Sequence, residues 1–436
     1  MTLSEGAPVA AGPEIRGLSP TRDVLDNGVT ILTKQTNTTP AVTLHASLLA
    51  AGSTSDPSSL AGVAHFVSRT IDRGTSRLTA DEIAEALDGR GVSLAVTVGR
   101  HALSLVCTCL VEDFDAILAL LADVVTSPTF PAEEVDRRRG EIVTLIRQDE
   151  DSPAAVATDA LMTMLYGESH PYGRPIRGTV ETVERIDRAV LQRFHGEHAA
   201  PDAMTLAIVG DVAPGRALDA ASRAFGQWKA TRIGEPPWPS VPVASGRRAR
   251  TMPMMNKSQT DIAYGFTSIA RSDPDFYAYS LMNNILGQYS LGGRLGDSIR
   301  ERQGMAYYVS SSLDANVIPG PLMIRAGVNP SNVERAIQSI DAELTSLIAT
   351  GPTADEVAES KQYLIGSMPR TLETNVGIAS FLQAIERFGL GLDYDVRMPG
   401  LLQQVTRDDV HEAARRAVDP SRAAIVVAGP YDGPLT

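Results

Sequence analysis

The sequence predicts an α+β protein made of two duplicated domains, each with a mostly antiparallel sheet packed against helices. In both halves of the chain, short segments with alternating apolar residues are interspersed with longer segments whose apolar residues recur three and four apart. The first pattern is typical of strands and the second of amphipathic helices. Their mixture in each half, and the recurrence of landmarks between the halves, favour this class over a single large domain.

The duplication is visible as three pairs of matching segments. The pairs are 201–210 with 420–429 at an offset of 219 residues, Asp56-Pro57 with Asp273-Pro274 at 217, and Val135 with Val357 at 222. A period near 220 residues is too long for a solenoid repeat and indicates two similar domains.

In the N-terminal half, the apolar pattern predicts the elements one by one. Strands are expected within 21–50, near 91–110 and at 205–211. The first helix is expected over about 59–72. The second should begin at Thr79, because Glu82 three residues later completes a capping box. The remaining helices expected in this half are 112–126, 131–150, 153–166 and 187–198.

Changes in composition suggest the domain boundaries. Residues 1–20 are expected to form a loose N-terminal arm, ahead of a first domain over 21–230. The stretch 231–250 is rich in proline and then in arginine, which predicts a stiff, solvated linker. The second domain should then cover 251–436.

Charge and composition limit the function classes. The net charge is −13, which argues against general binding to nucleic acid or to an anionic membrane surface. No signal peptide or bilayer-spanning apolar run is recognised, so a cytoplasmic location is expected. The two cysteines, Cys107 and Cys109, lie two apart in a predicted strand and are interpreted as small core residues.

Short motifs follow one another in a specific order along both halves. They are AGVAHF at 61–66, Gly74-Thr75, HPYGRP at 170–175, IVGDV at 208–212, Arg294-Leu295 and RERQGMAY at 300–307. Together they resemble the pitrilysin/insulinase (inverzincin) family, in its shorter branch related to the mitochondrial processing peptidases. The resemblance spans about residues 20–432 and implies one half of a clamshell, built from two metallopeptidase-like domains.

The family's zinc motif is degenerate in this sequence. In the family, one helix carries H-x-x-E-H, whose histidines hold zinc while the glutamate acts on bound water. Here His65 keeps the first position, but Ser68 replaces the glutamate and Arg69 the second histidine. The resemblance places the third ligand at Leu145, or at Ile146 if the spacing shifts by one. A guanidinium or a hydrocarbon side chain has no lone pair to donate, so we expect no metal in this chain.

Two other groups have side chains of a type that binds metal ions. Glu141, one helical turn before Leu145, could replace one ligand, but those of the first helix would still be missing. His195 and His198 have the H-x-x-H spacing, but they lie at a helix end before Pro201 and are interpreted as surface residues.

The C-terminal half retains a pair that the resemblance makes functional. In the family, the residues matching Arg300 and Tyr307 face the zinc site across a chamber and help to hold the peptide and its developing oxyanion. Both side chains donate hydrogen bonds to carbonyl oxygen. Arg300 is expected on a helix over about 294–302, with Tyr307 opening the next strand. The alternative is a surface arginine paired with an acid, and a tyrosine packed in the sheet.

The leading hypothesis is a non-catalytic, substrate-binding subunit of a heterodimeric zinc peptidase. The zinc would belong to a homologous partner chain, and this chain alone would contain no catalytic residue. An extended peptide would bind by adding a strand to a sheet edge. Two alternatives stay open: a structural or peptide-binding scaffold without protease activity, and an active metallopeptidase with unorthodox ligands. Neither nucleic acid nor a membrane is expected as a partner.

Overall fold

Two β-sheets, one in each half of the chain, organise the structure. The computed structural model describes residues 17–230, 239–242, 246–288 and 292–435. The strands of the first sheet are β1 (Thr21–Val24), β2 (Thr30–Gln35), β3 (Ala41–Leu49), β4 (Ala95–Val98), β5 (Ala102–Leu110) and β6 (Met204–Gly210). Those of the second are β7 (Arg248–Pro253), β8 (Thr260–Thr267), β9 (Ala306–Leu313), β10 (Pro321–Val328) and β11 (Ala424–Gly429).

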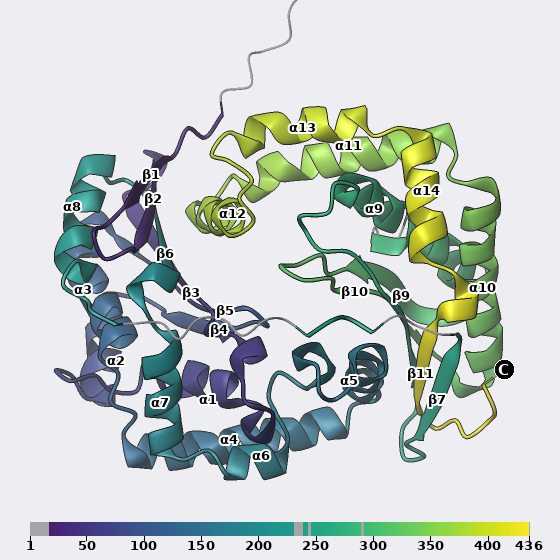
Figure 1. Cartoon of the computed structure of the whole chain (residues 1–436), viewed down its shortest axis with the longest axis horizontal. Coiled ribbons are helices and arrows are strands. Elements are labelled where there is room, and N and C mark those ends of the chain that lie inside the picture. Colours follow the sequence, from purple (N-terminus) through teal and green to yellow (C-terminus); the bar gives the residue numbers. More distant parts are fainter. Residues whose placement is uncertain (1–16, 231–238, 243–245, 289–291, 436) are drawn as a thin grey trace, which may run out of the picture.

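The two sheets share one topology (Figure 1). The first has the order β1-β2-β6-β3-β5-β4 and the second β7-β11-β8-β10-β9, so the second repeats the first without β1. In each sheet one pair is parallel, β2 with β6 and β7 with β11, and the other described pairs are antiparallel. The predicted α+β class, with a mostly antiparallel sheet in each half, is confirmed.

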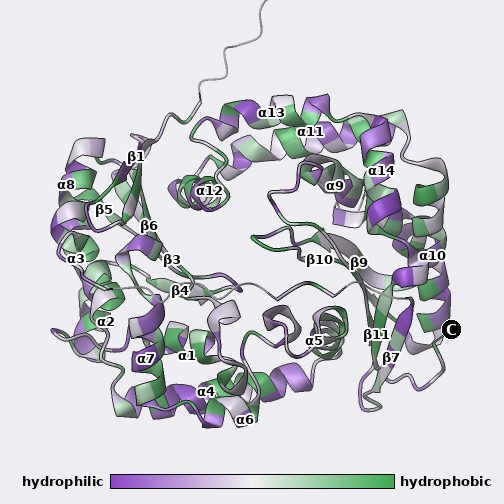
Figure 2. Ribbon diagram, viewed as in Figure 1, coloured by the Kyte–Doolittle hydropathy of each residue, from purple (hydrophilic) through white to green (hydrophobic). Residues whose placement is uncertain are grey.

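Helices surround both sheets. Those of the N-terminal half are α1 (Val63–Thr70), α2 (Ala80–Asp88), α3 (Phe114–Thr126), α4 (Ala132–Glu150), α5 (Pro153–Tyr166), α6 (Val180–Glu184), α7 (Arg188–His198) and α8 (Pro214–Phe225). Those of the C-terminal half are α9 (Phe276–Asn283), α10 (Val333–Thr350), α11 (Ala354–Thr371), α12 (Asn375–Arg387), α13 (Tyr394–Gln404) and α14 (Arg407–Ala417). Figure 2 shows polar and apolar residues alternating along most helices, as expected for helices with one buried face. No helix in the described ranges is long and apolar enough to cross a membrane.

The helix starts depend on local capping. The capping box at Thr79 is confirmed, since the Glu82 N–H donates to Thr79 Oγ1 and the Thr79 N–H donates to Glu82 Oε2. The first helix, however, is shorter than the predicted 59–72. It begins only at Val63, because Gly62 has φ +96°, a left-handed conformation that interrupts helical backbone.

The described ends of the predicted arm and of the predicted linker both contact the folded chain. The arm 1–20 lies mostly outside the described residues, but the Leu18 N–H donates to Asp395 Oδ2 at 2.5 Å and so holds its end against α13. Part of the linker also lies outside them, and its last residues are not solvated linker. The strand β7 begins at Arg248, and the guanidinium of Arg247 pairs with Asp341 at 2.9 Å. Because this segment is rich in arginine, the sequence did not predict a strand there. Its backbone nevertheless pairs with the buried strand β11.

The two halves exchange one helix each. Helix α5 follows the N-terminal sheet in sequence but packs on β8 and β11 of the C-terminal sheet, with Leu161 buried there. Helix α12 packs in return on β3 and β6, with Leu382 buried there (Figure 1). The two helices begin at Pro153 and Asn375, 222 residues apart, so they occupy equivalent positions in the repeat. The exchange therefore makes the hydrophobic core of each half depend on the other.

Burial keeps several histidines neutral, which predicts acid sensitivity. Desolvation lowers the pKa of His45, on β3, to about 4 and that of His101 to about 3. Because the unfolded chain binds these protons near pH 6.5, the free energy of unfolding should fall as pH drops from 6.5 toward 4. Each such histidine contributes a slope of up to about 1.4 kcal/mol per pH unit.

Urea unfolding of wild type and His45→Gln at several pH values measures this contribution. We expect a shallower slope in the variant between pH 6.5 and 4. Their difference at pH 8, where His45 is neutral in both states of the wild type, gives the packing cost of the substitution. Equal slopes in the acid range would contradict the role assigned to His45.

Candidate functional site

The surviving histidine of the degenerate motif lies in the wall of a large pocket. His65 projects from α1 into a cavity of about 660 Å³, to which α4, α5 and the loop 175–179 also contribute. Its Nε2 is buried and has no hydrogen-bond partner among the described residues. Burial, together with the nearby charges of Arg177 and Arg69, lowers its pKa to about 4, so the imidazole is neutral at pH 7. It could accept or donate one hydrogen bond there.

Ser68 is turned away from any chemistry in this pocket. The side chain is buried, and its hydroxyl donates to the carbonyl oxygen of His65 in the same helix at 2.6 Å. A serine hydroxyl bound to its own helix cannot replace a carboxylate that takes a proton from water. The position is therefore occupied by a structural residue.

Arg69 and Glu141 form an ion pair with each other. Arg69 Nη2 lies 3.8 Å from Glu141 Oε2, and Arg138 Nη1 donates to the same oxygen at 2.5 Å. The hydrogen bond from Arg138 is the main cause that lowers the pKa of Glu141. Because two guanidiniums compete for this carboxylate, Glu141 is a poor substitute for the missing metal ligand.

The third ligand position is hydrocarbon under either alignment. Leu145 is half-buried on α4, and the neighbouring Ile146 is buried and lines the His65 pocket. Throughout the described part of the chain, no group of three or more histidine, cysteine, aspartate or glutamate side chains could hold a metal ion. The residues at this site therefore do not fit a zinc ion.

Arg300 and Tyr307 are both accessible, but they lie apart from this pocket. Arg300 is on a helical segment over 294–302, as expected, whose last part (296–302) is π-helical. Its side chain is 40% exposed, with Nε 3.6 Å from Glu301 Oε1. Tyr307, on the edge strand β9, is 63% exposed, whereas Tyr308 is the tyrosine that packs inward and binds Asp261. Neither of the predicted pair lines the His65 pocket.

Comparison with known proteins identifies the family. The model described as Insulinase (Peptidase family M16) matches residues 30–180, and the one described as Peptidase M16 inactive domain matches residues 185–364. The chain belongs to the insulinase family, peptidase family M16. The resemblance drawn from the motifs is thus confirmed, and the inactive-domain model covers the helix that carries Arg300 and the strand that carries Tyr307.

Relatives of this M16 chain extend over most of its length. A protein of Mycobacterium leprae is 29% identical over 384 residues, which are 87% of this chain and 85% of the relative. One of Bacillus subtilis is 26% identical over 360 residues, or 81% and 84% of the two chains. Both are named uncharacterized zinc proteases. The crystal structure of a peptidase M16 inactive domain from Pseudomonas fluorescens superposes with a TM-score of 0.88 at 27% identity, covering 96% of this chain and all of that one.

Several residues that line the His65 pocket of the M16 chain were not predicted from the sequence. Arg177 forms an ion pair with Asp149, and both line the cavity beside His65. Arg100 and Asp159 line it as well, and burial raises the pKa of Asp159. Arg177 follows the HPYGRP motif by two residues, which was the signal available. The other three come from a turn and two helix faces that only the folded chain brings together.

His195 and His198, predicted to be surface residues, are partly buried in the M16 chain, and the two cysteines are buried. His195 Nε2 lies 2.8 Å from the carbonyl oxygen of Val125, and the ring of His198 lies 4.5 Å from that of Phe194. Cys107 and Cys109 are buried in β5 as free thiols, and burial raises their pKa values to about 12 and 11. A buried thiol that stays protonated at neutral pH is a poor nucleophile.

The donor set of the M16 chain predicts weak zinc binding. After dialysis, zinc measured by mass spectrometry should be far below one ion per chain, and Arg69→His alone should not raise it to one, because the third ligand position, Leu145, still lacks a donor. The variant combining Ser68→Glu, Arg69→His and Leu145→Glu is the matched gain-of-function control. One tightly held zinc per wild-type chain, lost in His65→Ala, would contradict this assignment.

Proposed function

We propose that this chain is the non-catalytic, substrate-binding subunit of a two-chain zinc peptidase, whose zinc is held by a homologous partner. The observation that carries the proposal is the contrast between the two halves. The N-terminal site keeps one imidazole and has lost every other donor. In the C-terminal half, Arg300 and Tyr307 are both accessible to solvent, and a ligand could therefore reach them.

The exposure of Tyr307 supports a role in binding. An aromatic side chain that is 63% exposed on a strand loses the burial that its neighbours gain, so packing does not account for its position. Its hydroxyl and the Arg300 guanidinium both donate hydrogen bonds, and their natural acceptors are the carbonyl oxygens of a peptide. In a complex, the same donors would stabilise an oxyanion as it forms.

The edge strand β4 supports peptide binding by strand addition. It lies at the end of the N-terminal sheet, and Ala95 and Thr97 are exposed along it. One of its residues, Val98, lines the His65 pocket. An unpaired strand edge binds an extended chain through main-chain hydrogen bonds, with little selection of sequence. A peptide on β4 would thus run beside the pocket.

Co-expression with an M16 partner that carries H-x-x-E-H tests the proposal. We expect the two chains to co-purify and to cleave a fluorogenic peptide that neither chain cleaves alone. Replacing the motif glutamate of the partner by glutamine should abolish cleavage. A partner that is equally active without this chain would refute the proposal, and a complex that binds peptide without cleaving it would favour a scaffold instead.

A further inference from the structure

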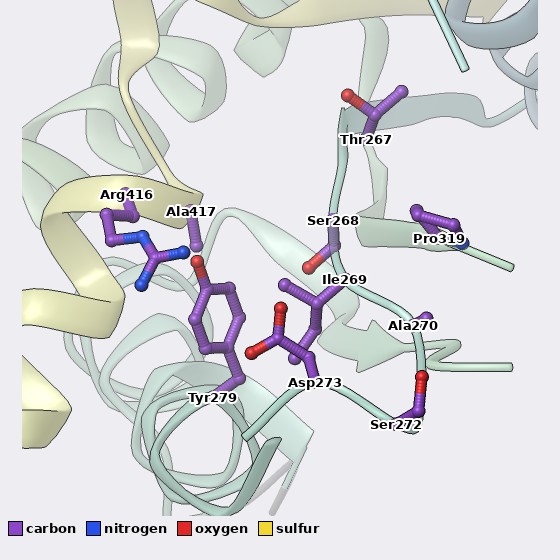
Figure 3. Close-up of a pocket in the computed structure, with 10 residues that line it drawn as sticks. All are labelled: Thr267, Ser268, Ile269, Ala270, Ser272, Asp273, Tyr279, Pro319, Arg416 and Ala417. Atoms are coloured by element: carbon purple, nitrogen blue, oxygen red, sulfur yellow. The ribbon is translucent and has the colours of Figure 1, made fainter. Parts of the chain in front are cut away.

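The duplication has produced two equivalent pockets, one in each half. The N-terminal pocket, of about 540 Å³, is lined by Asp56, His101 and His198 among others. The C-terminal pocket, of about 410 Å³, is lined by Asp273, Pro319 and Ala417 (Figure 3). These residues correspond pairwise at offsets of 217, 218 and 219, within the range of 217 to 222 found for the repeat. The two pockets can therefore be compared position by position.

In the C-terminal pocket, the positive charge is neutralised by the protein. Arg416 of α14 extends toward Tyr279 in Figure 3, and its Nη1 lies 2.5 Å from Asp275 Oδ2. Its guanidinium carbon is also 6.0 Å from the centre of the Tyr279 ring. The residue equivalent to Asp275 in the N-terminal half, 217 positions earlier, is Ser58. At the offset of 219, Arg416 itself corresponds to Glu197, so this arginine–acid pair as a whole has no counterpart in the other pocket.

In the N-terminal pocket, two arginines lack such an acid. Arg174 and Arg387 both line it, and neither has a carboxylate within 4.0 Å among the described residues. Arg387 Nη2 donates to the amide oxygen of Asn316 at 2.8 Å, but its Nε is buried with no hydrogen-bond partner in the described chain. Arg387 also lines a second cavity beside Gln383, so its side chain lies between the two. A guanidinium without a carboxylate partner retains N–H donors from which an anion would accept hydrogen bonds.

The acid within this pocket is already engaged. The oxygens of Asp56 accept hydrogen bonds from the Gly62 N–H at 2.6 Å and the Ala64 N–H at 3.0 Å, and so cap α1. Asp56 acts on Arg174 only at longer range, as the exposed Asp314 does on Arg387. The described lining of this pocket thus contains two guanidiniums and one carboxylate, and neither guanidinium pairs directly with an acid.

We propose that the N-terminal pocket binds an organic carboxylate, with Arg174 and Arg387 donating hydrogen bonds to its two oxygens. The planar guanidinium matches a carboxylate in geometry, and Leu49, Pro57 and Val317 supply apolar contacts for the body of the ligand. A volume near 540 Å³ is in the range of small-molecule pockets. The source is either the C-terminal carboxylate of a peptide or a free carboxylic acid. Since Arg174 belongs to the N-terminal half and Arg387 to α12, the ligand would bridge both halves.

Calorimetric titration of the purified full chain tests the ligand class. The probes are N-acetyl-leucine, N-acetyl-leucinamide, a leucine-containing tripeptide as acid and as amide, and inorganic phosphate. We expect at least one acid to bind, and its amide to bind about tenfold more weakly or not at all. Tighter binding of the tripeptide acid identifies a peptide terminus, and tighter binding of N-acetyl-leucine a free acid. Equal binding of acid and amide, absence of binding by both acids, or binding of phosphate alone would overturn the proposal.

Variants test the site. Arg174→Gln and Arg387→Gln should each weaken binding of the acid about tenfold or more. Arg416→Gln, in the equivalent C-terminal pocket, is the matched control and should leave it unchanged. Thermal melting identifies any variant that fails to fold, and Arg387→Lys retains the charge where the glutamine variant does not fold. Undiminished binding in Arg174→Gln, or an equal loss in Arg416→Gln, would show that the site is wrong.

Discussion

A two-chain complex in which Arg300→Ala is combined with Tyr307→Phe should cleave peptides at least about 100-fold more slowly than the wild-type complex. The two substitutions remove hydrogen-bond donors that, under the proposed function, reach the peptide carbonyl and the oxyanion that forms from it. Loss of one such preorganised donor typically costs a factor of about 100 to 1,000 in kcat. Steady-state kinetics of the reconstituted complex measure the effect.

The matched control is Arg302→Ala, on the same helical segment. Arg302 is exposed and pairs with Asp297 at 2.9 Å, so its loss should leave cleavage unchanged. Because Arg300 and Tyr307 are also accessible, their substitution should change the free energy of unfolding by no more than about 0.5 kcal/mol. A fully active double variant would remove the basis of the proposed function. A fall in kcat with little change in KM would place the pair in the transition state rather than in substrate binding.

Truncation of a buried leucine side chain on either exchanged helix should produce the largest loss of stability. Leu382 of α12 is 0% exposed and packs against Leu32, Ala207 and Val209 of the N-terminal sheet. Leu382→Ala should lower the free energy of unfolding by about 2–5 kcal/mol, the usual cost of the lost contacts and the cavity that remains. Leu161→Ala on α5 should have a similar effect, since Leu161 is equally buried in the opposite sheet.

Urea unfolding, monitored by circular dichroism, measures both losses. Val376→Ala, on the same helix as Leu382, is the control; Val376 is 45% exposed and should cost less than about 0.5 kcal/mol. If the exchange couples the halves, each leucine variant should shift a single transition that includes both sheets. A variant that unfolds one half and leaves the other at its wild-type midpoint would contradict that coupling.

Local signals in the sequence were sufficient for the fold class and for several elements of the N-terminal half. The helix expected over 153–166 has those bounds in the structure, and the capping box starts a helix after Thr79 as predicted. The first helix was predicted too long, since apolar spacing does not reveal that Gly62 adopts a positive φ. The exchange of α5 and α12 was not predicted either. Periodicity shows that a helix has a buried face, but not which sheet covers it.

The sequence predicted which metal ligands are missing from the candidate site better than it predicted the contacts of the residues that replace them. A motif position identifies Ser68 and Arg69 as non-ligands, because donor chemistry depends on residue type alone. The pairing of Arg69 with Glu141 depends on how α1 meets α4, which the sequence does not specify. Likewise, strand alternation implies that Tyr307 and Tyr308 face opposite sides, but only the folded sheet decides which of them is exposed.

Reciprocal packing of α5 and α12 also determines what a protease could do to this molecule. A chain severed once between Trp228 and Arg248 should remain one particle, since each fragment would still clasp a helix of the other. Separation of the fragments would expose the apolar faces of both helices to water at the same time. The two halves should therefore stay associated without the covalent connection, and they should move together as one unit.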